Sequence, residues 1–422
     1  MAFEKLFDLL KIGSLEIKNR YGMAPINSMF NDWTGMVSDE DIAFWIARAK
    51  GGVGLIIVGS VLCTELGRKL ASHQWIHMTG IEHVPRLALL AENIHLCGAK
   101  AFIQILPSPG SRARPVSGEM PIAPSADVVY GYADEKAHQI ADTLLTKGLT
   151  GRWLQEMYTS YPRPREVTEE EINKIIEESA QNAKWAVLAG YDGIEIHTCH
   201  HYIVDQFRDP RFNKRTDKYG GNRENRHRFL VEFVDAINGS VKEEKPDFIV
   251  GVRVGSECGS DGGYTFDDTK WLAGQLQELG IDYWHTTTGF PLLPAMRRDP
   301  KQDGEYLHWS GELKKILRIP VLTPRIHSPF LAEEAVTKGL TDMIMMARPL
   351  MADPEFPKKV MENRVEDIKQ CKKDEYCRVT ELLCLPRRCS VNPELGREKF
   401  NPKYQVREGF KGEEMLPYVL RE

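Results

Sequence analysis

The chain has 422 residues, a formal net charge of -5, and 42% hydrophobic and 27% charged residues, a composition typical of a globular protein. This slight acidity gives no electrostatic basis for binding nucleic acid or a membrane surface. Charged residues interrupt the N-terminal segment and no stretch reaches the ~18 apolar residues of a membrane span, so we expect a cytoplasmic protein without a signal peptide or a membrane partner.

Short apolar runs alternate with longer helical segments along the chain, which is the pattern of βα units around a parallel sheet. We expect eight strands, near residues 20–25, 53–58, 101–106, 193–197, 248–254, 282–287, 319–323 and 342–346. The helix expected over 168–189 begins with Thr168 three residues before Glu171, a capping-box pattern. Eight such units predict an α/β fold of the (β/α)8 TIM-barrel type.

Two segments are longer than a barrel needs. Residues 107–167 separate the third and fourth strands, where a connection is ordinarily much shorter, and include a helix expected near 134–147. Because connections that follow barrel strands lie on the active-site face, we interpret this insert as a substrate lid. The second segment, 361–422, is a cysteine-rich C-terminal extension of the barrel that residues 1–360 are expected to form.

Polar, titratable side chains follow the fourth expected strand. His197, His200, His201 and Tyr202 stand at its carboxyl end, where α/β barrels place their chemistry. A loop rich in arginine, aspartate, asparagine and glycine comes next, over 210–228. These residues predict a functional site at this strand end.

The stretch from 190 to 229, GYDGIEIHTCHHYIVDQFRDPRFNKRTDKYGGNRENRHRF, carries an ordered set of motifs. It resembles the signature of the old yellow enzyme family of FMN-dependent oxidoreductases, H-x-x-H/N-x-Y followed by P-x-x-N-x-R-x-D-x-Y-G-G-x-x-E-N-R. The resemblance covers roughly residues 3–357 and implies an FMN-binding TIM barrel. No G-x-G-x-x-G follows a strand, so a Rossmann dinucleotide site is not expected. Within the loop, a hydrogen-bonded network is expected around the two glycines from Asn213, Arg215, Asp217, Glu224 and Arg228.

The resemblance implies where FMN is held. The loops after the last two strands hold a phosphate group in many barrels, and here Arg325 and Arg348 offer charged forks to a phosphate dianion. The family usually has glycine where Pro324 and Ala347 stand, although Ala347 keeps a backbone amide and proline does not. The resemblance places further flavin contacts at Pro25, Asn27 (beside a flavin carbonyl), Gln104 (at the pyrimidine edge) and Arg253 (beside N1).

The same resemblance assigns catalytic roles. Charge develops on a carbonyl oxygen when hydride adds to a conjugated alkene, and His197 and His200 match the family's donors to that oxygen. Tyr202 matches its proton donor, and an ordinary tyrosine pKa near ~10 keeps it protonated at neutral pH. A metal site is the alternative for H-x-x-H-H, but zinc needs a further ligand that is not evident nearby. His201 replaces the family's glycine, so we expect it to narrow the pocket or to contact substrate.

Four of the eight cysteines fall close together near the C-terminus: Cys371, Cys377, Cys384 and Cys389. In a reducing cytoplasm such a group indicates a metal or iron–sulfur site rather than disulfides. It resembles the C-x2-C-x3-C-x11-C [4Fe–4S] motif of the family branch that holds 2,4-dienoyl-CoA reductases and amine N-demethylases. Gln370 and Lys373 stand at the first two cysteine positions. The expected ligands are therefore the four cysteines, or Asp374 in place of Cys384, with a zinc site or a lost site as alternatives.

These features together imply an FMN-dependent ene-reductase that reduces a C=C bond conjugated to a ketone or thioester. The alternatives are an amine N-demethylase of the same family, an electron-transfer subunit of a larger flavoprotein complex, or a flavin-free barrel. The sequence ends at Glu422, whereas cluster-bearing relatives continue into FAD and NAD(P)H domains. We therefore expect electrons from NAD(P)H directly or from a partner FAD-containing reductase subunit. A homo-oligomer would be common in the family.

Overall fold

The computed structural model describes residues 3–71, 74–113, 117–126, 163–259, 261–289, 302–382 and 384–404. Its centre is a barrel of eight strands: β3 (Tyr21–Met23), β4 (Leu55–Leu62), β6 (Lys100–Leu106), β9 (Gly193–Thr198), β10 (Ile249–Gly255), β11 (Tyr283–Thr287), β12 (Val321–Pro324) and β13 (Met343–Met346). Each strand pairs in parallel with the next, and β13 pairs with β3, so the sheet is closed. The expected (β/α)8 barrel and its eight strands are confirmed.

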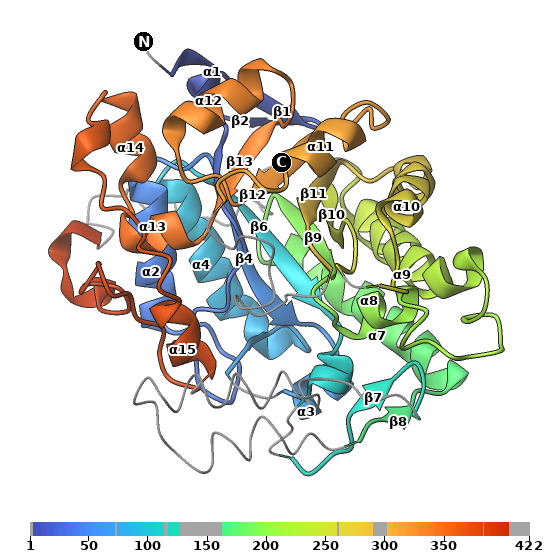
Figure 1. Ribbon diagram of the computed structural model, residues 1–422. Coiled ribbons are helices and arrows are strands. Elements are labelled where there is room, and N and C mark those ends of the chain that lie inside the picture. The colour runs from blue at the N-terminus through green and yellow to red at the C-terminus, as the bar shows by residue number, and fades with distance from the viewer. Residues whose placement is uncertain are drawn as a thin grey trace.

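Helices surround this barrel (Figure 1). The longer ones are α2 (Asp39–Lys50), α4 (Val84–Leu96), α7 (Glu169–Leu188), α9 (Arg223–Glu244), α10 (Phe266–Glu278), α11 (Leu307–Leu313) and α12 (Pro329–Thr337). The shorter helical elements are α1 (Glu4–Phe7), α3 (Glu65–Lys69), η2 (Gly110–Arg112), α8 (Ile203–Arg208), α13 (Arg348–Ala352), α14 (Phe356–Met361), α15 (Tyr376–Leu382) and η5 (Glu398–Phe400). In the described part of the chain, no helix has the length and apolarity to cross a bilayer. The capping box of Thr168 and Glu171 at the start of α7 is confirmed.

Side chains alternate along the barrel strands between the helices and the barrel interior. The isoleucines of β9 pack into the main hydrophobic core, whereas Glu195 hydrogen-bonds inside the barrel to Gln104 on β6 and His285 on β11. His197 follows two residues after Glu195 and is in register with Arg253 on β10. The alternation therefore brings polar side chains together inside the barrel, toward the carboxyl ends of its strands.

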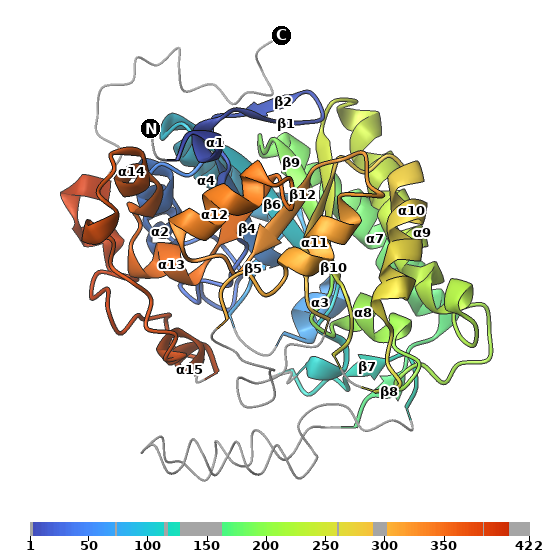
Figure 2. The ribbon, with the colours of Figure 1, turned by 45° about the horizontal axis from the view of Figure 1, so that its top comes forward.

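The opposite end of the barrel is closed by an antiparallel hairpin of β1 (Leu10–Ile12) and β2 (Leu15–Ile17). Residues of the hairpin share one buried apolar cluster with the interior residues Phe102, Ile249 and Tyr283. Figures 1 and 2 show this hairpin at one end of the molecule and α3 and α8 at the other. Because one end is closed by apolar packing, the polar interior opens only toward the carboxyl ends of the strands.

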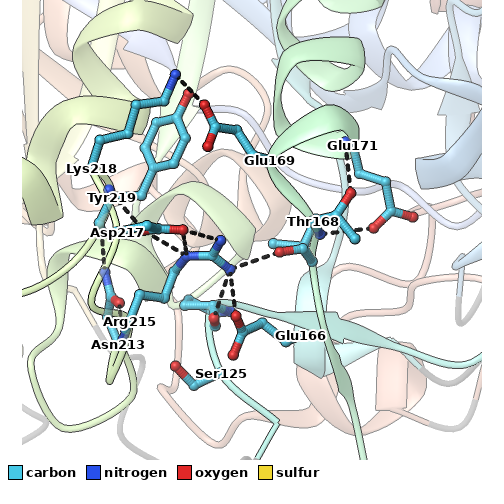
Figure 3. Close-up of polar contacts among 12 residues, drawn as sticks. Ser125, Glu166, Thr168, Glu169, Glu171, Asn213, Arg215, Asp217, Lys218 and Tyr219 are labelled. Atoms are coloured by element: carbon cyan, nitrogen blue, oxygen red, sulfur yellow. Dashed lines mark hydrogen bonds and ion pairs between the residues drawn. The ribbon is translucent and has the colours of Figure 1, made fainter.

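Arg215 ties the loop after β9 to both edges of the insert (Figure 3). Its guanidinium pairs with Asp217 and donates to the carbonyl oxygens of Pro124 and Val167 at 3.1 and 2.7 Å. Asn213 donates to two backbone carbonyls at 2.8 and 2.7 Å, which fixes the loop in the expected way. Arg228 donates to a further carbonyl at 2.9 Å, but the ion pair of exposed Glu224 is with Arg223 at 3.8 Å, outside this network.

The described edges of the insert form a small parallel ladder of β7 (Ile122–Ala123) with β8 (Arg165–Glu166). The helix expected near 134–147 lies outside the described residues. The interpretation of the insert as a lid stays a prediction.

The segment after the barrel packs against it. Arg48 on α2 and Glu398 on η5 form an ion pair at 2.6 Å, in which the side chains are 0% and 2% exposed. Asn392 donates to a backbone carbonyl of α13 at 2.8 Å, and Arg387 donates to the carbonyl oxygen of Asn27 at 2.8 Å. The described part of the C-terminal segment therefore shares its buried contacts with the barrel.

Candidate active site

A pocket opens at the carboxyl ends of the barrel strands. Six of the residues expected from sequence line it: Pro25, His200, Arg253, Arg325, Ala347 and Arg348. The other lining residues include Thr287, Tyr306, His327 and methionines of β13. The loops after β12 and β13 supply two arginines to one wall of the pocket. Strand β10 and the turn after β9 supply Arg253 and His200 to another wall. The residues expected to hold a flavin thus come from four strand ends, and His200, expected to be catalytic, comes from a fifth.

His197 and His200 lie against each other at the end of β9. Nδ1 of His200 is 3.2 Å from Nε2 of His197, and Nε2 of His200 is 3.2 Å from the hydroxyl of Thr287. Burial, with the nearby cation Arg253, lowers the pKa of both histidines well below the ordinary value. Both rings are therefore neutral at neutral pH, and each has one N–H to donate.

The turn that carries these rings has an unusual backbone. His200 and His201 both have φ of 59°, in the left-handed region where non-glycine residues are uncommon. Asp205 accepts the amide of His201 at 2.8 Å, and Gln206 donates to its carbonyl at 2.8 Å. The ring of His201 packs edge-on against Phe212, with centroids 4.4 Å apart. This ring is buried and is not among the pocket-lining residues, so the expected narrowing of the pocket by His201 finds no support in its position.

Tyr202 follows this turn and is the N-cap of α8. Its ring lies 5.1 Å from the ring of His197 and 6.0 Å from that of Trp75, both nearly perpendicular. Burial raises the pKa of Tyr202, partly opposed by the charge of Arg112. The phenol therefore stays protonated at neutral pH, next to the two histidines.

A buried polar network lies beneath the pocket. Gln104 accepts a hydrogen bond from Ser60 at 2.6 Å and donates to Glu195 at 2.7 Å. Glu195 also contacts Nδ1 of His285 at 2.8 Å and accepts from Tyr283 at 3.2 Å. Burial alone would raise the pKa of Glu195, but His285 and Arg253 more than offset it and leave the pKa lowered. An ionised carboxylate is thus fixed inside the barrel.

Arg253 is the side chain best placed to meet an added ligand. It is 9% exposed and lines the pocket, and its Nε is buried without a hydrogen-bond partner among the described residues. A buried guanidinium nitrogen without a partner is costly, so a ligand that accepts from it is stabilised. A heterocycle with acceptor nitrogen or carbonyl oxygen atoms, such as the flavin ring, would satisfy this donor, and the expected contact of Arg253 with FMN stays a prediction.

The two arginines expected at the phosphate have acidic partners. Arg325 has φ of 65° and pairs with Glu305 at 2.5 Å. Arg348, the first residue of α13, pairs with Glu375 at 2.5 Å. Burial and the nearby cation Arg348 lower the pKa of His327, between these arginines, to about 3. Each guanidinium is thus neutralised by a carboxylate, and a phosphate dianion bound at this wall would share the two arginines with Glu305 and Glu375.

Asn27 and Gln104 are turned toward protein partners. The side chain of Asn27 donates to the carbonyl oxygen of Gln74 at 2.9 Å and is not among the pocket-lining residues. Gln104 is 1% exposed and lies in the network under the pocket. Their expected contacts with the flavin stay predictions.

A second pocket lies beside the first. It is lined by Cys371, Cys377 and Cys389, together with Asp374, Glu375 and Arg348. Cys384 is not among its lining residues. Burial raises the pKa of the Cys377 thiol to about 11, and Arg387 and Arg348 oppose the rise. Arg348 lines both pockets, so the cysteines lie next to the phosphate wall.

Sequence reasoning missed several residues of this site. Glu195 stands among apolar residues in its strand, but its spacing of two from His197 places both on the same inward face, which is a usable signal. Arg112 and Glu375 gave no comparable signal, because each acts through a contact with a residue far along the chain.

Comparisons with known proteins show the family of this chain. The profile of the NADH:flavin oxidoreductase / NADH oxidase family matches residues 5–367. NADH oxidase of Thermoanaerobacter brockii is 34% identical over 405 residues, which cover 94% of this chain and 57% of that protein. Cinnamate reductase of Clostridium sporogenes is 32% identical over 431 residues, which cover 94% and 59%. A structure of 2-naphthoyl-CoA reductase with 2-naphthoyl-CoA gives a TM-score of 0.81 at 29% identity, with coverage of 95% and 58%. The chain thus spans less than two thirds of each of these relatives.

Proposed function

Because the chain belongs to the NADH:flavin oxidoreductase / NADH oxidase family, to which the old yellow enzymes belong, we propose that it is an FMN-dependent ene-reductase. Its substrate would be an alkene conjugated to a ketone or thioester. The single observation that carries this proposal is the placement of a neutral histidine pair, 3.2 Å apart, beside the protonated ring of Tyr202. His200 lines the pocket, and His197 and Tyr202 lie against it, outside the lining residues, as a further donor and a proton source.

The residues present fit FMN. Arg253 has a buried Nε without a partner among the described residues, and Arg325 and Arg348 line the pocket where they would bind the phosphate. Reduced FMN, when bound, supplies a hydride to the substrate.

The protein side chains have separate roles in this proposal. His197 and His200 donate to the carbonyl oxygen of the substrate, which favours the enolate charge that develops there. Tyr202 holds the proton that is delivered to the carbon next to the carbonyl. The buried Glu195 network fixes the interior beneath them and takes no part in proton transfer.

The substrate class is supported by the pocket and by the names of relatives. Two relatives are named for cinnamate and 2-naphthoyl-CoA. In cinnamate an alkene is conjugated to a carboxylate, and in 2-naphthoyl-CoA an aromatic ring is conjugated to a thioester. An amine oxidase would need an acidic or aromatic site for a cation. Among the described residues that line the pocket none is acidic, and Tyr306 is its one aromatic residue apart from the histidines. This favours carbonyl substrates over amines.

The second pocket supports a cofactor proposal. We propose that Cys371, Cys377 and Cys389 hold a [4Fe–4S] cluster, with Asp374 as fourth ligand in place of Cys384. A single tetrahedral zinc would draw sulfurs to about 3.8 Å of one another, given a Zn–S bond of about 2.3 Å. In the described chain no three ligand atoms of this pocket lie within 4.8 Å of one another. These ligand atoms are therefore farther apart than a tetrahedral zinc site would hold them, which favours the cluster over a single zinc ion in this proposal.

The electron donor follows from the same arrangement. Because Arg348 lines both pockets, a cluster on the cysteines would lie beside the flavin phosphate wall. Electrons would reach the flavin from NAD(P)H at the open pocket, or from a partner FAD-containing reductase through the cluster.

The test uses protein loaded with FMN under anaerobic conditions and reduced with dithionite, so that the natural electron donor is not needed. Reduced protein is mixed with 2-cyclohexenone, cinnamate or cinnamoyl-CoA while flavin reoxidation is followed. We expect a saturated product that carries solvent deuterium next to the carbonyl. Tyr202→Phe should slow reoxidation about 100-fold or more. Tyr191→Phe is the matched control, because that hydroxyl is buried without a partner among the described residues.

Other outcomes identify the rivals. Flavin reduction by dimethylglycine, without reoxidation by any conjugated alkene, would mean amine oxidation. Equal reoxidation rates in Tyr202→Phe and Tyr191→Phe would mean that Tyr202 is not the proton donor. Reoxidation by no conjugated alkene, together with no flavin reduction by dimethylglycine, would mean that the chain only relays electrons.

A further inference from the structure

Arg112 contacts two members of the proposed catalytic turn at once. It is the last residue of η2, shortly after β6. Its Nη1 donates to the carbonyl oxygen of His200 at 2.6 Å, and its guanidinium carbon lies 4.7 Å from the centre of the Tyr202 ring. No other role has been assigned to this side chain above.

The first contact concerns the geometry of the turn. His200 and His201 share a left-handed backbone that costs free energy for residues with a Cβ. Asp205 and Gln206 bind the amide and the carbonyl of His201, the second residue of the turn. Arg112 binds the carbonyl of His200, the residue whose ring is the expected donor. The direction of that ring therefore depends on where the guanidinium lies.

The second contact concerns the acidity of Tyr202. A cation against the ring stabilises the phenolate more than the phenol, so it opposes the rise in pKa that burial causes. The groups that face this phenol come from four elements, and their charges oppose one another. They are Arg112 on η2, Arg378 and Glu381 on α15, Cys199 after β9, and the rings of His197 and Trp75.

We propose that Arg112 is a positioning residue that sets the His200 donor and the Tyr202 proton donor in one geometry. Its charge, held against the Tyr202 ring, also favours transfer of the phenolic proton to substrate. This inference rests on the proposed function, because it concerns the same site. Lysine in its place would keep the charge but, as a single point charge, could not make both contacts in a planar fork. Glutamine would keep a hydrogen-bond donor and lose the charge. The two substitutions therefore separate geometry from charge.

The first experiment does not depend on turnover. Protein with 13C-labelled tyrosine is titrated by NMR, and the Tyr202 signal is assigned by its loss in Tyr202→Phe. We expect Arg112→Gln to raise the pKa of Tyr202 by about 1, whereas Arg112→Lys leaves it close to the wild-type value. The other tyrosine signals report whether each variant is folded. An unchanged pKa of Tyr202 in folded Arg112→Gln would overturn the role of the charge.

The second experiment separates the two half-reactions. We expect Arg112→Gln to slow reoxidation by a conjugated alkene about 10-fold and to leave flavin reduction by dithionite unchanged. The alkaline limb of the pH profile should move upward in this variant, because a less acidic Tyr202 stays protonated to higher pH. Arg112→Lys should be slowed less and keep the wild-type limb.

The outcomes distinguish this inference from the proposed function. Equal slowing of both half-reactions in Arg112→Gln would mean a general structural role and would overturn the inference. If no alkene reoxidises the wild-type flavin, the proposed function fails, and the NMR titration still decides whether Arg112 sets the acidity of Tyr202.

Discussion

The guanidinium of Arg348 lies 2.5 Å from the carboxylate of Glu375, and this ion pair stands between the two pockets of the molecule. Arg348 begins α13 at the barrel, whereas Glu375 immediately precedes α15 in the cysteine-bearing segment. A phosphate bound at the barrel therefore shares its cation with the segment that we propose to hold the cluster. A substitution or a bound ligand in one pocket should therefore alter binding in the other through this ion pair.

We expect Arg348→Ala to weaken FMN binding about 10-fold to 100-fold, because a charge-assisted hydrogen bond contributes about 1.5–3 kcal/mol. Glu375→Gln should retain FMN at least as well as wild type, since it leaves Arg348 unneutralised. Flavin released into an ultrafiltrate gives the dissociation constants. Arg318→Ala is the control, because that exposed arginine pairs with Glu278 on the surface. Equal FMN retention in Arg348→Ala and Arg318→Ala would place the phosphate elsewhere.

Substitution of single cysteines should separate the two ligand sets. We expect Cys377→Ala to lose most iron and acid-labile sulfide, because Cys377 lines the pocket. Cys384→Ala is the matched variant from the same segment and should keep both. Asp374→Ala should lower the iron content and change the EPR spectrum of the reduced protein. Loss of iron in Cys384→Ala, with none in Asp374→Ala, would restore the four-cysteine set.

The network of Arg215 should contribute to stability. Arg215→Ala removes a guanidinium that joins Asp217 to the carbonyl oxygens of Pro124 and Val167 (Figure 3). Loss of one partner from a largely buried pair of this kind costs about 3 kcal/mol. Urea unfolding followed by tryptophan fluorescence measures the difference. Arg228→Ala, in the helix α9 that follows the loop and more exposed, should cost much less. Equal costs would contradict the central role of Arg215.

Acid sensitivity should depend on His227. Burial lowers its pKa from 6.5 to about 3, so below pH 6.5 the unfolded chain binds a proton that the folded chain does not. The free energy of unfolding therefore decreases as the pH falls from 6.5 toward 3. Each pH unit below 6.5 lowers the free energy of unfolding by about 1.4 kcal/mol, so neutral His227 should lower it by about 2 kcal/mol at pH 5. We expect the stability gap between wild type and His227→Gln to narrow by that amount from pH 7 to pH 5. A constant gap would mean that His227 does not titrate in this way.

The strands and the pocket could be predicted because they depend on local patterns. The apolar runs that become β9 and β10 are short, bounded by glycine and followed by polar residues, which is sufficient to place a barrel strand and its functional end. The motif around His197 then placed several pocket residues through family resemblance. These predictions required no knowledge of how distant segments meet.

The remaining features depend on contacts between distant segments. The partner of Arg348 is 27 residues away and that of Arg112 is 88 residues away, and no periodicity encodes either distance. The choice between Asp374 and Cys384 likewise turns on which side chains face one pocket. The position of the His201 ring also depends on such a contact. We expected the ring near the substrate, but with a left-handed backbone it packs against Phe212.

The buried ion pair of Arg48 and Glu398 has a consequence for how this polypeptide can be divided. Cutting the chain after α14 would leave the Arg48 charge in the interior without its carboxylate, at a cost of about 3–5 kcal/mol. The extension therefore stabilises the folded barrel, whether or not it holds a metal. Substituting its cysteines should change metal binding, whereas removing the whole segment should also destabilise the barrel.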